Sequence, residues 1–338
     1  MIEITGLSKT YAGPQNRQIE VLKDITLSVP AGSITAVVGP SGAGKSTLAK
    51  CISLLERPTS GSIRVNGEDL SHYTGETLRH KRRAIGTVFQ SSALLQRKTA
   101  WENVALPLEW LGVVPGEIKR HVGTLLESVG LSDKAGFYPS QLSGGQRQRV
   151  GIARALALKP SVLLADEATS GLDPDATRAI LTLLKTLRDQ FGLSIIFITH
   201  EMDVVRRAAD AVAQIADGRL VQQGHLRQLL ATPDSSLGQQ LFPLQPLAGS
   251  GDLLLQLTYG DRPIAIDWIS RLTQQFAVKV DLLAAHVEQV GDALAGRMRV
   301  AIRFSHSGVT PRQVTEQLQH YGIHAEILEQ RAALQEVV

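Results

Sequence analysis

One short segment constrains the fold of this chain more than any other feature. It follows the apolar run Ile34–Val38 and precedes an expected helix, Ser46–Leu55. Its residues fit the pattern G-x-x-x-x-G-K-[ST] and are Gly39, Pro40, Ser41, Gly42, Ala43, Gly44, Lys45, Ser46 and Thr47. Glycines let backbone N–H groups turn inward around phosphate oxygens, and the helix N-terminus adds a favourable dipole. A glycine-rich turn that merely ends in Lys-Ser is the alternative, but the flanking strand and helix favour a nucleotide site.

Two further apolar runs, Val162–Ala165 and Ile195–Ile198, indicate more strands of the same kind. Strands that are apolar on both faces are typical of a parallel sheet covered by helices, which predicts an α/β core. The first of these runs ends in Asp166 and Glu167, at the edge where such sheets bind ligands. Asp166 suits the shell of a Mg²⁺ ion, and Glu167 suits the polarisation of a water that attacks a γ-phosphate. Apolar strands often end in acidic residues, so this motif indicates a nucleotide site only in combination with the phosphate loop.

In the phosphate loop itself, Lys45 is expected to reach the β- and γ-phosphates, and the Ser46 hydroxyl is expected to bind Mg²⁺. The opening segment differs from the rest of the core. Its alternating apolar residues, among them Ile2, Ile4 and Ile25, predict more exposed antiparallel strands.

A third motif lies between the phosphate loop and the acidic strand end. Ser143, Gly144, Gly145 and Gln146 follow Leu142 and begin a predicted helix that runs to Leu158. Free N–H groups at such a helix start form a pocket for an anion, although an ordinary helix cap has the same sequence preferences. With all three motifs in this order, the chain resembles the nucleotide-binding subunit of an ATP-binding-cassette (ABC) transporter over about residues 1–230.

The resemblance assigns roles to other residues. Tyr11 would stack on adenine, Gln90 would sense the γ-phosphate through Mg²⁺, and His200 would contact the γ-phosphate. The segment 170–173 would cross a dimer interface. In this family the signature residues Ser143 to Gln146 complete the nucleotide site of a second cassette. Because the chain has one copy of each motif, the resemblance implies a homodimer that holds two ATP molecules.

The chain after residue 230 predicts a linker and a second domain. Residues 231–251 are rich in Pro, Gly, Ser and Gln, which is typical of a linker. Residues 252–338 follow the order strand, helix, strand, strand, helix, strand, which predicts a small α+β ferredoxin-like domain. This part resembles the regulatory domain of bacterial methionine importer ATPases. A dimerisation module without a ligand is the alternative.

This second resemblance implies partners and regulation. The ATPase dimer would work with multispanning permease subunits and, indirectly, with a substrate-binding lipoprotein, and intracellular methionine would inhibit it. The resemblance implies a ligand site at Asp281, Leu282 and Leu283, where the family has Asn-Ile-Leu. The Asp281 carboxylate could repel the carboxylate of an amino acid or pair with its ammonium group. Importers of another small amino acid or analogue, and a soluble cassette ATPase that switches a non-transport partner, remain alternatives.

Composition limits the other classes of function. The net charge of +3 is small and supports no nucleic-acid role. The one cysteine, Cys51, excludes an internal disulfide. A helix that spans a bilayer needs ~20 consecutive apolar residues, and the apolar runs here are far shorter. The resemblance to importer ATPases implies a peripheral protein at the cytoplasmic face of the inner membrane, held there by the permease.

Overall fold

The computed structural model describes residues 1–14, 17–90, 92–244, 251–260, 264–290, 293–305 and 308–330. The chain divides into two compact units, Met1–Gln223 and Gly224–Val338, and each is described by itself.

The first unit is built on a six-stranded sheet in the order β10-β9-β3-β8-β7-β6. The strands are β10 (Arg219–His225), β9 (Ala211–Ala216), β3 (Ile34–Val38), β8 (Ser194–Ile198), β7 (Val162–Asp166) and β6 (Ile85–Val88). From β9 to β6 the neighbouring strands are parallel. The expected parallel α/β core is therefore confirmed.

This sheet lies between two hydrophobic cores, which explains why its strands are apolar on both faces. In β8, Ile195 and Phe197 belong to one core, whereas Ile196 and Ile198 belong to the other. The first core also contains helices α3 (Ala100–Trp110), α4 (Pro115–Ser128), α5 (Gly144–Leu156) and α6 (Pro174–Phe191). The second core contains helix α1 (Lys45–Ile52) and an antiparallel sheet.

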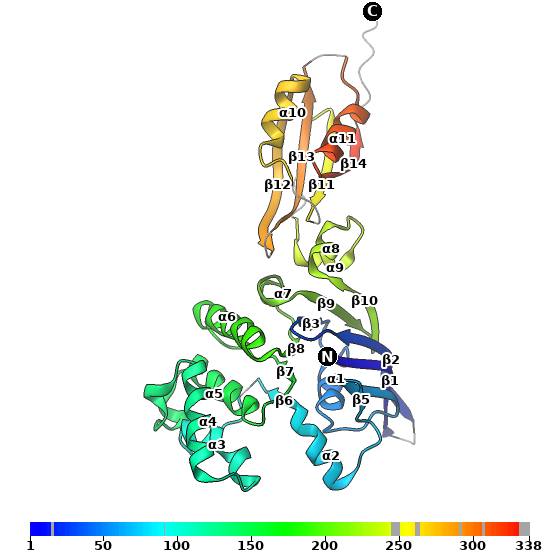
Figure 1. Ribbon diagram of the computed structural model, residues 1–338. Helices are drawn as coiled ribbons and strands as arrows, with labels where there is room; N and C mark the ends of the chain where they lie inside the picture. The colour runs from blue at the N-terminus through cyan, green and yellow to red at the C-terminus, as the bar shows by residue number, and fades with distance from the viewer. Residues whose placement is uncertain are drawn as a thin grey trace, which may run out of the picture. The chain divides into compact units, whose positions relative to one another are not determined.

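The antiparallel sheet has the order β2-β1-β4-β5. Its strands are β1 (Ile2–Ala12), β2 (Gln18–Val29), β4 (Ser60–Val65) and β5 (Glu68–Asp69). Ile2, Ile4 and Ile25 are buried, so the predicted antiparallel strands turn one face towards the core. The remaining α-helices in the described part of this unit are α2 (Gly75–Lys81) and α7 (Met202–Ala208), both labelled in Figure 1.

The second unit contains a four-stranded antiparallel sheet in the order β12-β13-β11-β14. Its elements are β11 (Leu253–Tyr259), α10 (Trp268–Phe276), β12 (Val278–Val290), β13 (Ala293–Phe304), α11 (Pro311–His320) and β14 (His324–Gln330). Trp268, Leu272, Val314 and Leu318 of the two helices share a hydrophobic core with the sheet. The strand order and the covering helices agree with the predicted ferredoxin-like arrangement.

The segment predicted as a linker, 231–251, differs from that description. Helix α9 (Ser236–Leu241) lies within it, and helix α8 (Leu226–Ala231) immediately precedes it. Leu237 and Leu241 are fully buried, and the Ser235 hydroxyl accepts a hydrogen bond from the Gly238 N–H at 2.8 Å. Short amphipathic helices rich in Gln, Gly and Ser have the composition of a linker, which is why the pattern was misleading. Residues 245–250 of the predicted linker lie outside the described residues.

A buried arginine fixes this helical segment to the C-terminal sheet. Arg297 of β13 is 1% exposed, and its guanidinium donates to the carbonyl oxygens of Thr232 (2.6 Å) and Pro233 (3.1 Å). Phe242 stacks on His286 of β12, with ring centroids 4.4 Å apart. The segment that follows β10 is therefore part of the C-terminal unit, and the division of the chain falls earlier than the sequence pattern suggested.

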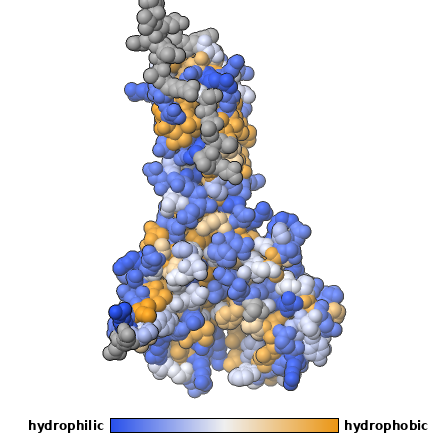
Figure 2. All heavy atoms as spheres, turned by 180° about the vertical axis from the view of Figure 1, so that it is seen from behind, coloured by the Kyte–Doolittle hydropathy of each residue, from blue (hydrophilic) through white to orange (hydrophobic). Residues whose placement is uncertain are grey.

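Hydrophobic and hydrophilic residues intermingle over the face seen in the space-filling view (Figure 2). Within the described ranges, no helix has both the length and the apolar character that crossing a membrane requires.

Candidate functional site

The carboxyl edge of the parallel sheet collects the residues expected to bind nucleotide. The phosphate loop follows β3, and His200 follows β8 after one residue. Asp166 is the last residue of β7, Glu167 comes directly after it, and Gln90 comes shortly after β6. These strands are neighbours in the order β3-β8-β7-β6, so their ends lie in a row (Figure 1). Residues that are far apart in the sequence thus meet at the edge where open α/β sheets bind ligands.

The phosphate loop has the geometry of an anion site. Gly44 has φ +101°, which L-residues rarely adopt, and a Cβ at Gly39 would lie 2.1 Å from the carbonyl oxygen of Ile215. The ammonium group of Lys45 donates to the carbonyl oxygens of Gly39 (2.7 Å) and Pro40 (2.9 Å). Ser41, on the outer side of the loop, is exposed. The loop is therefore open to solvent on one side and lined by a cation on the other.

Lys45 is a buried cation without a direct ionic partner. It is 9% exposed, and no carboxylate of a described residue lies within ion-pair distance of it. Burial lowers the pKa of Lys45, while Glu167 and Asp166 act in the opposite direction. A buried unpaired charge is costly, so the site favours an anionic ligand such as a phosphate group.

Asp166 and Glu167 add negative charge close to this cation. Burial raises the pKa of Asp166, Glu167 raises it further, and Lys45 lowers it. Gln90 donates from Nε2 to the Ser170 hydroxyl at 3.1 Å. The predicted metal set of Ser46, Gln90 and Asp166 offers one carboxylate, and no group of three or more His, Cys, Asp or Glu among the described residues could hold a metal. Such a sparse set fits Mg²⁺, which keeps water and phosphate oxygens as ligands.

Glu167 and His200 face each other across two neighbouring strands. The Nδ1 atom of His200 lies 3.3 Å from Oε1 of Glu167. Glu167 has φ +47°, and its N–H donates to the carbonyl oxygen of Ile198 at 2.9 Å. A left-handed conformation is strained for glutamate and persists only where the surrounding structure holds it, which is common at functional sites.

Tyr11 lies beside the phosphate loop. Its hydroxyl donates to the carboxylate of Glu56 and also interacts with the side chain of Thr47. Burial raises the pKa of Tyr11, and Glu56 adds to this effect. Glu56 is separated from Tyr11 by 45 positions, so no local pattern in the sequence could have found this pair.

The signature residues form a capped helix start. The Ser143 hydroxyl accepts from the Gln146 N–H (3.3 Å), and the Gln146 side chain accepts from the Ser143 N–H (2.9 Å). Ser143, Gly145 and Gln146 line a hollow of about 270 Å³, and no phosphate-loop residue lines it. Helix α5 packs on α3, α4, α6 and β6, whereas α1 packs on β2 and β7 (Figure 1). The signature and the phosphate loop of one chain therefore occupy different parts of the unit.

The sequence did not identify the residues of α5 that hold the segment around Gln90. Gln148 donates from Nε2 to the carbonyl oxygen of Phe89 at 3.2 Å. Arg154 donates to the carbonyl oxygens of Ser92 (2.7 Å) and Ala93 (2.9 Å). Both of these accepting residues have positive φ values, so Arg154 stabilises a strained backbone a few residues after the strand β6.

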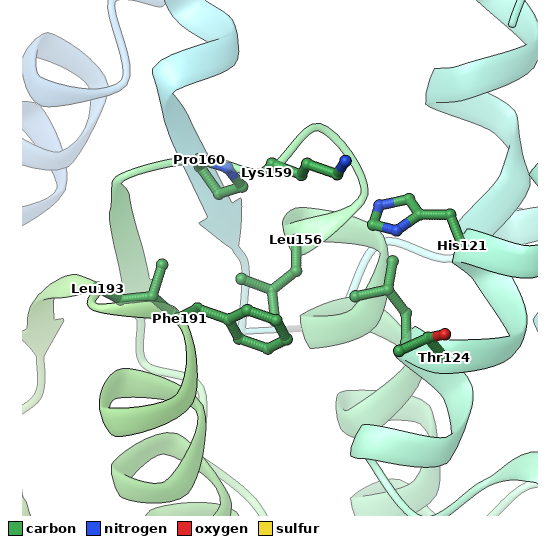
Figure 3. Close-up of a pocket in the computed structure, with 8 residues that line it drawn as sticks. His121, Thr124, Leu156, Lys159, Pro160, Phe191 and Leu193 are labelled. Atoms are coloured by element: carbon green, nitrogen blue, oxygen red, sulfur yellow. The ribbon is translucent and has the colours of Figure 1, made fainter. Parts of the chain in front are cut away.

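A separate cavity of about 330 Å³ lies away from these residues. Figure 3 shows its lining, which comes from α4, from the end of α5 and the turn after it, and from the end of α6 and the turn after it; it includes His121, Lys159 and Phe191. No predicted site residue is among its lining residues.

In the C-terminal unit, Asp281, Leu282 and Leu283 lie on strand β12. The Asp281 carboxylate accepts a hydrogen bond from Arg303 of the neighbouring strand β13. The pairing of the two strands shifts by one residue between Leu282 and Ala284, so Leu283 lies in a bulge. The Leu282 side chain is exposed. The carboxylate that departs from the family pattern is thus already partnered within its own sheet.

Comparison with known proteins agrees with this geometry. The ABC transporter family model matches residues 22–170. The methionine import ATP-binding protein MetN 1 of Rhodococcus jostii is 50% identical over 326 residues, which cover 96% of this chain and 95% of that protein. The methionine import ATP-binding protein MetN 2 of Yersinia pestis bv. Antiqua is 46% identical, over 97% of this chain and all of that protein.

Among solved structures, a dimeric ATP-binding cassette in a post-hydrolysis state with ADP and Pi is similar to this chain. It has a TM-score of 0.61 and 34% sequence identity, and the match covers 67% of this chain and 99% of that one. The likeness therefore includes both sequence and fold. The chain belongs to the ABC transporter family, as one of its ATP-binding proteins.

Proposed function

We propose that this chain is the ATP-hydrolysing subunit of a methionine importer and that it works as a homodimer bound to permease subunits. The observation that carries the proposal is the row of Lys45, His200 and Glu167 along one sheet edge, with the buried Lys45 ammonium lacking an ion-pair partner among the described residues. The names of the relatives, which are similar over almost the whole chain, support methionine as the substrate.

The proposed chemistry is hydrolysis of the γ-phosphate of ATP. The backbone of the phosphate loop and Lys45 hold the phosphates, and Tyr11 stacks on adenine. Ser46, Gln90 and Asp166 hold Mg²⁺, which neutralises phosphate charge when it is bound. Glu167 accepts a proton from the attacking water, and His200 contacts the γ-phosphate and orients the Glu167 carboxylate, from which it lies 3.3 Å away.

The dimer follows from the separation of the motifs within one chain. Ser143, Gly144, Gly145 and Gln146 form an anion-binding helix start, but the hollow that they line contains no phosphate-loop residue. A phosphate can reach them when a second chain supplies it. The related cassette with ADP and Pi is dimeric, which supports the same assembly here.

The permease, the substrate-binding lipoprotein and the peripheral location at the cytoplasmic membrane face belong to the same proposal. The C-terminal unit is proposed to sense methionine and to inhibit ATP hydrolysis. Its ligand would have to bind the separated cassettes more tightly than the closed dimer, because only differential affinity shifts an equilibrium. The proposed nucleotide-binding domain lies within residues 1–230 and the proposed ferredoxin-like domain within 252–338. The helices α8 and α9 belong to the second compact unit, which begins at Gly224.

Reconstitution in lipid vesicles tests this function. The chain is co-purified with its permease, and ATP hydrolysis and amino-acid uptake are measured with methionine and with other small amino acids. We expect uptake of methionine that requires Lys45 and Glu167, and slower ATP hydrolysis when methionine is present on the side of the ATPase. Uptake of a different amino acid would identify another importer. A chain that hydrolyses ATP but co-purifies with no permease would indicate a non-transport switch.

A further inference from the structure

The phenol of Tyr11 is held by a network that the nucleotide motifs do not include. Its hydroxyl donates to Glu56, which lies directly after helix α1 and its terminal turn. The Glu56 carboxylate also pairs with Lys50 at 3.1 Å and with Lys9 at 3.8 Å. Lys9 in turn donates to the carbonyl oxygen of Arg57 at 2.7 Å, so strand β1 and the turn after α1 are tied together.

The same lysine restricts which face of the tyrosine ring is open. The Lys9 ammonium lies 4.9 Å from the centroid of the Tyr11 ring. A cation at this distance is attracted to the ring face that it covers. A flat ligand therefore has the opposite face for stacking. Contacts at the hydroxyl and at one face together fix both the position and the tilt of the ring.

The protonation states of Tyr11 and Glu56 favour the hydrogen bond between them. The hydrogen bond from Tyr11, followed by Lys50 and Lys9, keeps the pKa of Glu56 below its usual range, although burial opposes this. The pKa of Tyr11 is raised by burial and by Glu56. The proton therefore stays on the phenol at neutral pH, and the carboxylate stays an acceptor.

We infer that Glu56 is a positioning residue of the nucleotide site, which holds Tyr11 in the orientation that stacks on the base. This inference rests on the proposed role of Tyr11. A ring that is ordered before the ligand arrives loses less conformational entropy on binding, so affinity rises without a new contact to the ligand. Glu56 therefore contributes to the part of the affinity that depends on the base and not to the part that depends on the phosphates.

Two readouts on the full-length chain separate these parts. The first is the KM and kcat for ATP hydrolysis. The second is the inhibition constant of inorganic triphosphate, which has the phosphates of ATP but no base. Glu56→Ala removes the acceptor, whereas Glu56→Gln keeps an oxygen that can accept from the phenol. Tyr11→Ala removes the ring, and the double variant with Glu56→Ala tests whether Glu56 acts through it.

We expect Glu56→Ala to raise the KM for ATP about 3- to 10-fold and to leave kcat almost unchanged. The increase in KM should be smaller than the increase caused by removing the stacking ring itself. The inhibition constant of triphosphate should stay within about twofold, and Glu56→Gln should restore most of the affinity for ATP. In the Tyr11→Ala background, Glu56→Ala should have no further effect on KM.

Other outcomes overturn the inference. If Glu56→Ala weakens the binding of triphosphate as much as the binding of ATP, Glu56 supports the whole phosphate loop rather than the Tyr11 ring. If the two substitutions weaken ATP additively, Glu56 does not act through Tyr11. If Tyr11→Ala leaves the KM for ATP unchanged, the ring does not bind the base and the inference is wrong, whereas ATP hydrolysis that depends on Lys45 still supports the proposed function.

Discussion

The Nδ1 atom of His200 lies 3.3 Å from Oε1 of Glu167, although 33 positions separate the two residues. The contact follows from the register of two parallel strands, because Asp166 of β7 is paired with Ile198 of β8. Each residue comes just after its strand, so both side chains emerge at the same edge. At this distance the imidazole can form a hydrogen bond with the carboxylate and hold it in one orientation.

Removal of the Glu167 charge should stop hydrolysis but not binding. Glu167→Gln keeps the size and hydrogen bonding of the side chain and loses the base. We expect the rate of ATP hydrolysis to fall by ~10²–10⁴-fold. ATP binding should persist, and dimers with ATP should accumulate in size-exclusion chromatography. Glu127→Gln, at an exposed position of α4, is the matched control and should hydrolyse ATP normally. Turnover close to that of the control in Glu167→Gln would show that another group is the base.

The signature residues should act on the nucleotide of the partner chain. A Lys45→Ala chain cannot hold phosphate, and a Ser143→Arg chain cannot complete the site of its partner. In a mixed dimer, one of the two nucleotide sites combines the intact Lys45 of the Ser143→Arg chain with the intact Ser143 of the Lys45→Ala chain. We expect ATPase activity in purified mixed dimers, carrying two different tags, that clearly exceeds the activity of either homodimer. Equal, residual activity in all three preparations would mean that each site is built from a single chain.

Neutralising Asp166 should stabilise the chain when nucleotide is absent. Its pKa is raised in the folded state, so the folded protein holds the proton more tightly than the unfolded chain does. The stabilising effect of protonation is complete below the unfolded pKa and is lost as pH rises through the folded pKa. At neutral pH the charged form therefore costs stability.

Asp166→Asn removes this unfavourable charge and should raise the Tm of the nucleotide-free protein by about 2 °C at neutral pH. Substitutions that remove a destabilising functional group often stabilise a protein in this way. The difference should shrink as the pH falls through the raised pKa of Asp166. Stabilisation by ATP with Mg²⁺ should decrease in the variant. A Tm difference that grows towards acid pH would contradict the assigned direction.

Loss of Arg297 should loosen the helices that precede the C-terminal sheet. Arg297→Ala leaves the carbonyl oxygens of Thr232 and Pro233 without their donors and creates a cavity. We expect a loss of ~2–4 kcal/mol in the stability of this unit and faster hydrogen exchange in residues 226–241. Arg312→Ala, which removes an exposed ion pair of α11, should change stability by less than about 0.5 kcal/mol. Unchanged exchange in 226–241 would show that Arg297 does not hold this segment.

The departure at Asp281 should have a small effect on regulation. Its carboxylate pairs with Arg303, and both side chains are partly exposed, at 41% and 52%. Exposed ion pairs contribute at most about 1 kcal/mol, so Asp281→Asn should change the methionine concentration for half-maximal inhibition by less than about fivefold. The measurement is ATP hydrolysis by the complex with permease, with Asp267→Asn as the control at another exposed ion pair. A much larger change would mean that Asp281 contacts the ligand directly.

Local patterns in the sequence were sufficient for the elements that carry the nucleotide motifs. The runs Ile34–Val38, Val162–Ala165 and Ile195–Ile198 correspond to β3, β7 and β8, because strands buried on both faces must be apolar throughout. The alternating strands of the C-terminal unit were equally clear. The helices α8 and α9 were not, because they are short and their burial depends on tertiary contacts that no local pattern contains. Helix α8 packs on β11 and β13, and α9 packs on α8.

The sequence by itself determined that this chain has a phosphate loop, an acidic strand end and a signature helix, since each depends on consecutive residues with fixed chemistry. Only the tertiary structure decided how distant residues combine. Strand order brought His200 to Glu167, packing of the turn after α1 brought Glu56 to Tyr11, and burial of Arg297 attached 226–241 to the C-terminal sheet. The physical reason is that hydrogen bonds and charges act over a few ångströms of space, and only the packed cores set which residues come that close.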